Sequence, residues 1–164
     1  MIPMSETALE VLYSSTHIAV DFGYSFYSYE VMLLAMMDDN SVADILEAHG
    51  ADLTEVEENL QNYMDANYEK FNDQKIPAQF VSHLDRNRYI EESINTHKNT
   101  QNAVKEIGQA AQKIASAERA EEIEVDHLFL ALLSTEAGEA YKILAKNGLN
   151  LEDVTEYLQK GQEF

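Results

Sequence analysis

The spacing in this sequence that is most suggestive of chemistry is Glu124-x-x-His127, which sets a carboxylate and an imidazole about one helical turn apart. Such a pair supplies two ligands of a carboxylate-bridged di-iron centre, but the centre also needs a second Glu-x-x-His pair and further glutamates. The sequence holds no second pair. We therefore interpret His127 as a capping or packing residue, and a metal-dependent hydrolase or oxidase remains only as the alternative from the enzyme class.

The other reactive side chains show no catalytic arrangement. The remaining histidines have no ligand spacing with one another, and the absence of cysteine excludes disulfides, thiolate metal sites and cysteine nucleophiles. None of the six glycines is followed by lysine, so the phosphate-binding loop of nucleotide hydrolases is missing. No nucleophile-elbow motif supports a Ser-His-Asp triad. We predict a protein with no catalytic residues, no metal site and no cofactor.

Composition and charge narrow the class of partner. The 164 residues suffice for one compact domain, and an apolar content of 45% is typical of globular proteins. There is no apolar run long enough to span a membrane and no basic amino-terminal signal region, so we expect a soluble cytoplasmic protein that does not bind membranes. A net charge of −19 would repel nucleic acid and attract basic partners, although it also serves solubility.

The elements that must position any functional side chain occur twice. Residues 29–56 begin with a predicted helix that is apolar on nearly every side. A second helical segment follows, then a glycine, and then a polar residue that can cap the next helix. Residues 126–154 repeat this order, with one insertion between helices. The matched positions are Leu34 with Leu130, Ala35 with Ala131, Ile45 with Ile143, Leu46 with Leu144 and Gly50 with Gly148. A match of this length predicts an internal repeat.

The predicted fold is all-α: two pseudo-symmetric four-helix repeats that form one compact domain over residues 1–164. Helical spacing and capping residues predict helices at about 5–22, 29–37, 41–49 and 53–65 in the first repeat, and at about 101–120, 125–133, 136–147 and 151–158 in the second. Repeat one thus covers about 5–65, a partly helical and loosely packed connector 66–98, and repeat two about 99–161. The second helix of each repeat has almost no polar face, which predicts burial at the centre.

Two stretches resemble the Clp amino-terminal domain. They are Ala19-x3-Gly23-x6-Glu30-Val-Met-Leu-Leu-Ala35, and Ala115-x10-Asp126-His127-Leu-Phe-Leu-Ala-Leu-Leu133, where the family's Glu-His-Leu-Leu-Leu-Ala-Leu-Leu pattern is nearly intact. This domain precedes the AAA+ rings of unfoldases of the ClpA and ClpC type. The resemblance implies a non-catalytic docking module, monomeric as an isolated domain, whose partner is a ClpS-like adaptor, a substrate protein or the Clp ATPase itself. The alternative is a free-standing acidic decoy that sequesters an adaptor or a basic partner.

The resemblance also implies where a partner binds. Glu30 and Asp126 stand where the family places an acidic residue that pairs with a guanidinium group in phosphoarginine recognition, and Ser5 matches the hydroxyl at the start of the first helix. Gln101 replaces the second-repeat counterpart of that hydroxyl, and Val31 replaces the family's histidine, so this chain departs from the pattern at both places.

The aromatic loop before Glu30 is the remaining candidate contact. Tyr24 and Phe26 belong to a group of four aromatic residues in a six-residue stretch, which either packs over the first helix or contacts a partner directly. We include Tyr24 and Phe26 among the predicted partner-binding residues.

Overall fold

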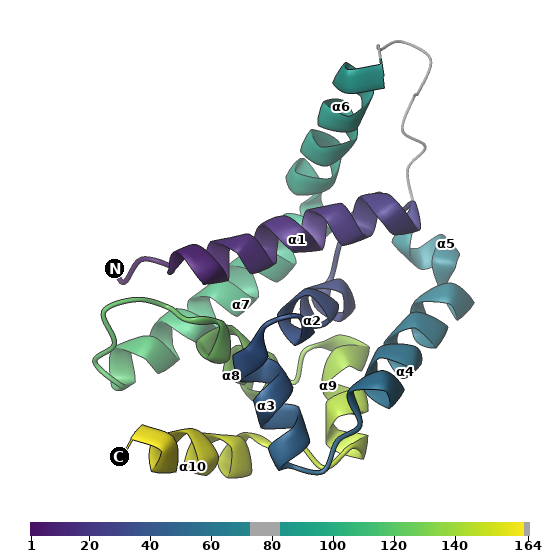
Figure 1. The fold of residues 1–164 in the computed structure, drawn as a ribbon. Helices are drawn as coiled ribbons and strands as arrows, with labels where there is room; N and C mark the ends of the chain where they lie inside the picture. The colour runs from purple at the N-terminus through teal and green to yellow at the C-terminus, as the bar shows by residue number, and fades with distance from the viewer. Residues whose placement is uncertain (73–82, 163–164) are drawn as a thin grey trace.

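The computed structural model describes residues 1–72 and 83–162, and the side chains of residues 1–72 and 88–160. The predicted all-α fold is confirmed (Figure 1). The first repeat contains α1 (Glu6–Phe22), α2 (Tyr29–Met37), α3 (Asn40–Ala48) and α4 (Leu53–Ala66). Next come α5 (Tyr68–Phe71) and α6 (His83–Thr96). The second repeat contains α7 (Lys98–Ala117), α8 (Val125–Ser134), α9 (Gly138–Lys146) and α10 (Leu151–Gln162).

The central helices are α2 and α8, the two apolar helices that the repeat predicts to be buried. Seven residues in a row, 30–36, are buried in α2, and 127–133 are buried in α8. Each central helix packs on the third helix of the other repeat, because α2 contacts α9 and α3 contacts α8, while α2 and α8 also touch each other. Figure 1 shows α2 in the middle of the molecule. The two repeats therefore share one core instead of forming separate lobes.

Several helix ends follow the capping chemistry of their residues. Ser5 Oγ accepts a hydrogen bond from the Ala8 amide at 3.1 Å, and Asp52 accepts from the amide of Thr54 at 2.9 Å. Gly23 ends α1 in the left-handed conformation with φ of 76°, a conformation that favours glycine. These three ends confirm the sequence prediction because a cap depends on residues within one turn of itself.

Other helix starts differ from the prediction. The sequence predicts Ser41 as the cap of the third helix, but α3 begins at Asn40 and is capped by Asp39, whose carboxylate accepts the Ser41 amide at 2.9 Å. Helix α7 begins three residues earlier than predicted, since Nδ1 of His97 accepts the Asn99 amide at 3.0 Å. Helix α9 begins at Gly138 instead of residue 136, because Glu136 has a positive φ of 51° and so turns the chain out of the helical conformation.

The connector is packed more tightly than predicted. Helix α6 contacts both α1 and α7, and Ile94 on it is fully buried. Thr16 of α1 donates a hydrogen bond to Asn95 of α6 at 2.7 Å. The sequence also predicts an apolar helix face in the connector, made of Phe80, Leu84, Ile90 and Ile94. Phe80 and Leu84 lie outside the residues whose side chains are described. The connector is thus part of the fold at its carboxyl end.

Candidate functional site

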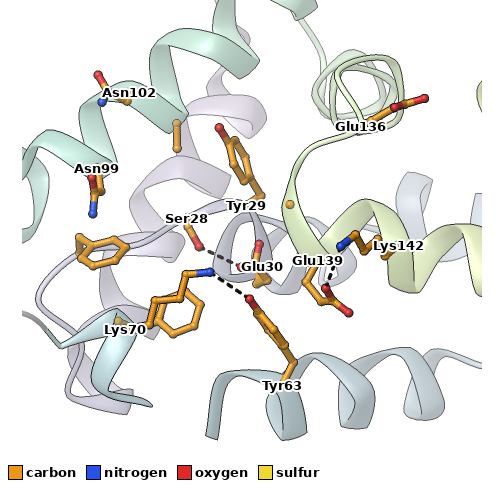
Figure 2. A pocket seen from close by; sticks show the side chains of 14 residues that line it. Ser28, Tyr29, Glu30, Tyr63, Lys70, Asn99, Asn102, Glu136, Glu139 and Lys142 are labelled. Carbon is orange, nitrogen blue, oxygen red and sulfur yellow. Dashed lines mark hydrogen bonds and ion pairs between the residues drawn. The ribbon is translucent and has the colours of Figure 1, made fainter. Parts of the chain in front are cut away.

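A pocket of about 490 Å³ opens beside the start of α2, at a place where both repeats contribute residues. Its polar lining comes from the α1–α2 loop, α2, α4, α5, α7, and the start of α9 together with the turn before it (Figure 2). The polar side chains that line it are those of Ser28, Tyr29, Glu30, Tyr63, Lys70, Asn99, Asn102, Glu136, Glu139 and Lys142. A pocket formed where several elements meet is the usual place for ligand binding.

Glu30 is the buried acidic group of this pocket. The residue is 4% exposed, and its Oε1 accepts a hydrogen bond from the Ser28 hydroxyl at 3.3 Å. The second oxygen, Oε2, is buried and has no hydrogen-bond partner among the described residues. Burial raises the pKa of the Glu30 carboxyl above its ordinary value. Buried polar atoms are nearly always satisfied, so this oxygen keeps the capacity to accept a further hydrogen bond.

Gly138 allows the start of α9 to approach Glu30. Its φ is +58°, and a Cβ atom at this position would lie 2.9 Å from Glu30 Oε2 and 3.0 Å from Cδ2 of Tyr29. Helix α9 has no side-chain cap, so its first amides are not used by a capping residue. The positive end of the α9 dipole therefore faces the region of the carboxylate, which favours its charged form.

Basic side chains lie at the rim. Lys70 Nζ donates a hydrogen bond to the Tyr63 hydroxyl at 3.3 Å, and Lys142 pairs with Glu139 at 3.8 Å (Figure 2). Both contacts are exposed and cost little to break. The pocket thus combines one buried carboxylate with two amino groups that can turn toward a ligand. This arrangement suits a ligand group that carries both a hydrogen-bond donor and a negative charge.

Tyr29 ties the start of α2 to α7. Its hydroxyl donates a hydrogen bond to the carboxylate of Glu106. Burial, followed by this hydrogen bond, raises the pKa of Tyr29 to about 12, so the hydroxyl keeps its proton and remains a donor at neutral pH. The contact fixes the wall of the pocket next to Glu30.

Asp126 occupies the equivalent position in the second repeat. Its Oδ1 is also buried and without a hydrogen-bond partner in the described part of the chain, and burial raises the pKa of its carboxyl. Ser5 lies on this side of the molecule: its amide donates to the Ile123 carbonyl at 2.9 Å, three residues before Asp126. Ser5 does not line the pocket that contains Glu30. The hydroxyl of Ser5 already accepts its own capping bond.

His127 has a structural role that defines its tautomer. Its Nδ1 accepts the Glu124 amide at 2.9 Å, and its Nε2 lies 2.8 Å from Glu118 Oε2. An Nδ1 that accepts a hydrogen bond carries no proton, so Nε2 must carry it and donate to Glu118. Together with the bond from the His127 amide to the Glu124 side chain, this forms a capping box. The interpretation of His127 as a capping residue is confirmed.

The aromatic loop divides into two parts. Tyr24 is 2% exposed and its ring packs against Phe22, Tyr68 and Phe71, so it belongs to the core and lies outside the pocket. Phe26 is also buried, but it lines the pocket. Local packing thus accounts for Tyr24, and we leave it out of the proposed site. The sequence had no signal for Gly138, Lys70 or Lys142, because they reach the pocket only through the packing of α5 and α9.

The buried carboxylates predict a pH dependence of stability. A folded-state pKa above the unfolded value of 4.5 makes Glu30 bind its proton more tightly in the folded chain. Protonation of Glu30 should therefore stabilise the folded chain. This contribution to the free energy of unfolding is fully present below pH 4.5 and is lost as the pH rises through the raised pKa. We expect Glu30→Gln to be more stable than the wild type at neutral pH, with the difference shrinking toward pH 4.5.

Urea titrations of both proteins across this pH range measure the difference. Glu47→Gln, on the exposed face of α3, is the control for the loss of one acidic side chain. A stability difference between wild type and Glu30→Gln that does not change with pH would contradict the raised pKa.

The fold and the pocket define a class: an all-helical domain of two repeats, with a pocket where the repeats meet. Comparison with known proteins supplies the family. Residues 98–162 match the family model described as the Clp repeat (R) N-terminal domain, a non-catalytic family, which confirms the resemblance for the second repeat. The match spans α7 to α10, which form the second repeat, and this family points to association with Clp-type AAA+ proteins. No curated protein matches the chain. None of its described helices is long and apolar enough to cross a membrane.

Proposed function

We propose that this protein is a non-catalytic docking module of a Clp-type AAA+ system, and that the pocket at Glu30 receives a side chain of the bound protein. The observation that carries the proposal is the unpartnered Oε2 of Glu30, buried at the base of a pocket that both repeats form. The family match supports the class of function. A ClpS-like adaptor or a substrate protein is the proposed partner.

The expected contact is a charge-assisted hydrogen bond. A guanidinium or ammonium group can donate to Glu30 Oε2, and hydrogen bonds to charged groups are the stronger kind. Lys70 and Lys142 at the rim can then bind a carboxylate or phosphate attached to the same ligand. This mixture of charges supports a phosphoarginine side chain as the ligand, with Asn99 and Asn102 at the start of α7 as further hydrogen-bonding groups.

Binding of the ClpS-like adaptor from the same cell tests the proposal. Loss of one hydrogen bond to a charged group is worth about 1.5–3 kcal/mol, so Glu30→Gln should weaken the affinity about 10- to 150-fold in isothermal titration calorimetry. Glu47→Gln removes an exposed charge from α3 and should leave the affinity within about twofold.

Competition defines the ligand group. Free phosphoarginine should displace the adaptor at lower concentration than free arginine if the lysines take part. An affinity that Glu30→Gln leaves unchanged would overturn the assignment of this pocket as the docking site.

Sequestration by a free-standing protein is the second candidate function. Residues 1–69 contain acidic residues throughout but no lysine or arginine, so the first repeat presents a strongly acidic surface that would attract a basic partner. The discriminating observation is whether the native reading frame continues into a phosphate-binding loop. A continuation would make this chain part of an unfoldase and would exclude the free-standing decoy.

A further inference from the structure

A second cavity lies on the first repeat and shares no residue with the pocket at Glu30. It measures about 290 Å³ and is formed where α1 and α2 end and α4 begins. Its floor is apolar and consists of Ile18, Phe22, Leu34, Met37 and Leu53. Phe22 is 37% exposed, which is unusual for a phenylalanine that lines a cavity. We call this cavity the acidic groove, for the residues at its edge.

Two carboxylates and no basic group surround this apolar floor. Asp38 and Glu57 line the groove, both are exposed, and neither forms a salt bridge within the described residues. All lysines and arginines of the chain lie beyond residue 69, so no cation from the first repeat can neutralise them.

Helix dipoles increase the negative potential. Helices α1 and α2 end at Phe22 and Met37, both on the groove, and neither helix has a basic residue in its last turn. The carboxyl end of a helix carries a partial negative charge that favours a cation. The amino-terminal end of α4, which carries the positive end of that helix dipole, also lies at the groove. The amides of Thr54 and Glu55 in its first turn are already bonded to the carboxylate of Asp52.

We propose that the acidic groove docks a basic amphipathic segment of a partner protein, in which an apolar side chain is flanked by lysine or arginine. The apolar side chain covers Phe22 and fills the groove, and the flanking cations pair with Asp38 and Glu57. Nucleic acid and anionic membranes do not fit, because the same charges repel them.

The proposal adds a second contact to the one at Glu30 and does not depend on it. A partner that used both sites would be held at two separate places on the domain, which increases affinity without a larger contact at either place.

A fluorescein-labelled amphipathic peptide of leucine and lysine is the probe, and anisotropy measures its binding to the full chain at low salt. The double variant Asp38→Asn/Glu57→Gln should weaken binding about three- to tenfold, as expected for two exposed ion pairs. Asp44→Asn/Glu47→Gln on α3 removes the same charge from exposed positions outside the groove. It should change the logarithm of the dissociation constant by less than half as much as the groove variant does.

Two further comparisons separate apolar and electrostatic contributions. Phe22→Ala should weaken binding at high salt as well as at low salt, because apolar burial is not screened, while circular dichroism checks that the variant is folded. A peptide with serine in place of leucine should bind weakly to every variant.

Comparison of the variants shows whether the peptide binds in the acidic groove, in the pocket at Glu30, or to the acidic surface in general. Equal weakening by the two double variants would show general attraction to an acidic surface and would overturn the groove as a site. Weakening by Glu30→Gln to the same extent as by the groove variant would assign the peptide to the first pocket instead. Unchanged binding of the peptide in Glu30→Gln, with loss in the groove variant, supports the proposal whatever the adaptor does.

Discussion

Replacing Phe129 with alanine should lower the free energy of unfolding by about 3–5 kcal/mol, the usual cost of truncating a fully buried phenylalanine. Phe129 is 0% exposed and lies on α8, which contacts helices from both repeats. The cavity left by the ring would be lined by elements that hold one another in place, so the surroundings can relax only partly. Urea unfolding followed by circular dichroism measures the loss.

Leu9→Ala is the control for this experiment. Leu9 lies on α1 and is 54% exposed, so its truncation should change stability by no more than about 0.5 kcal/mol. A loss below about 1.5 kcal/mol for Phe129→Ala would show that α8 is not the centre of a shared core. Two separate unfolding transitions would likewise contradict a core that both repeats form.

Gly138→Ala should destabilise the protein by about 2–5 kcal/mol and weaken adaptor docking at the same time. The left-handed backbone conformation costs a residue with a side chain about 1–2 kcal/mol, and overpacking costs about 1–3 kcal/mol more. The overpacking arises because the new methyl group would meet Glu30 Oε2 at 2.9 Å. The carboxylate must then move, which alters the proposed docking contact.

Gly50→Ala provides a matched control. Gly50 also has a positive φ, of 79°, but a Cβ atom there would meet nothing within 4 Å. It should therefore show the cost of the backbone conformation, about 1–2 kcal/mol, without the clash and without an effect on docking. Equal losses of stability in the two variants would contradict a close approach of α9 to Glu30.

A double-mutant cycle tests the same contact from the other side. In a Glu30→Ala background the carboxylate is absent, so Gly138→Ala should cost less than it does in the wild type. A coupling near zero would mean that Tyr29, at 3.0 Å from the same Cβ position, causes the whole clash. Unfolding in urea gives all four stabilities.

The helices themselves could be predicted from the sequence. An apolar stretch without a polar face has to be buried on all sides, and α2 and α8 are. Ends with a strong local cap were also predictable, as for Ser5 and Asp52, because the cap and the amides it bonds lie within one turn. The start of α7 was predicted too late because its cap is His97, a residue type that is not favoured there.

The sequence by itself determined the repeat, the central helices, the family resemblance of the second repeat and the two acidic positions, Glu30 and Asp126. Each depends on residue type and on spacing along the chain. Only the tertiary structure decided that Glu30 faces the start of α9 and the lysines of the rim, and that Ser5 lies near the segment leading into α8. The physical reason is that each repeat buries its central helix against the third helix of the other. Such a contact between distant segments forms from apolar burial and shape, and neither leaves a local pattern in the sequence.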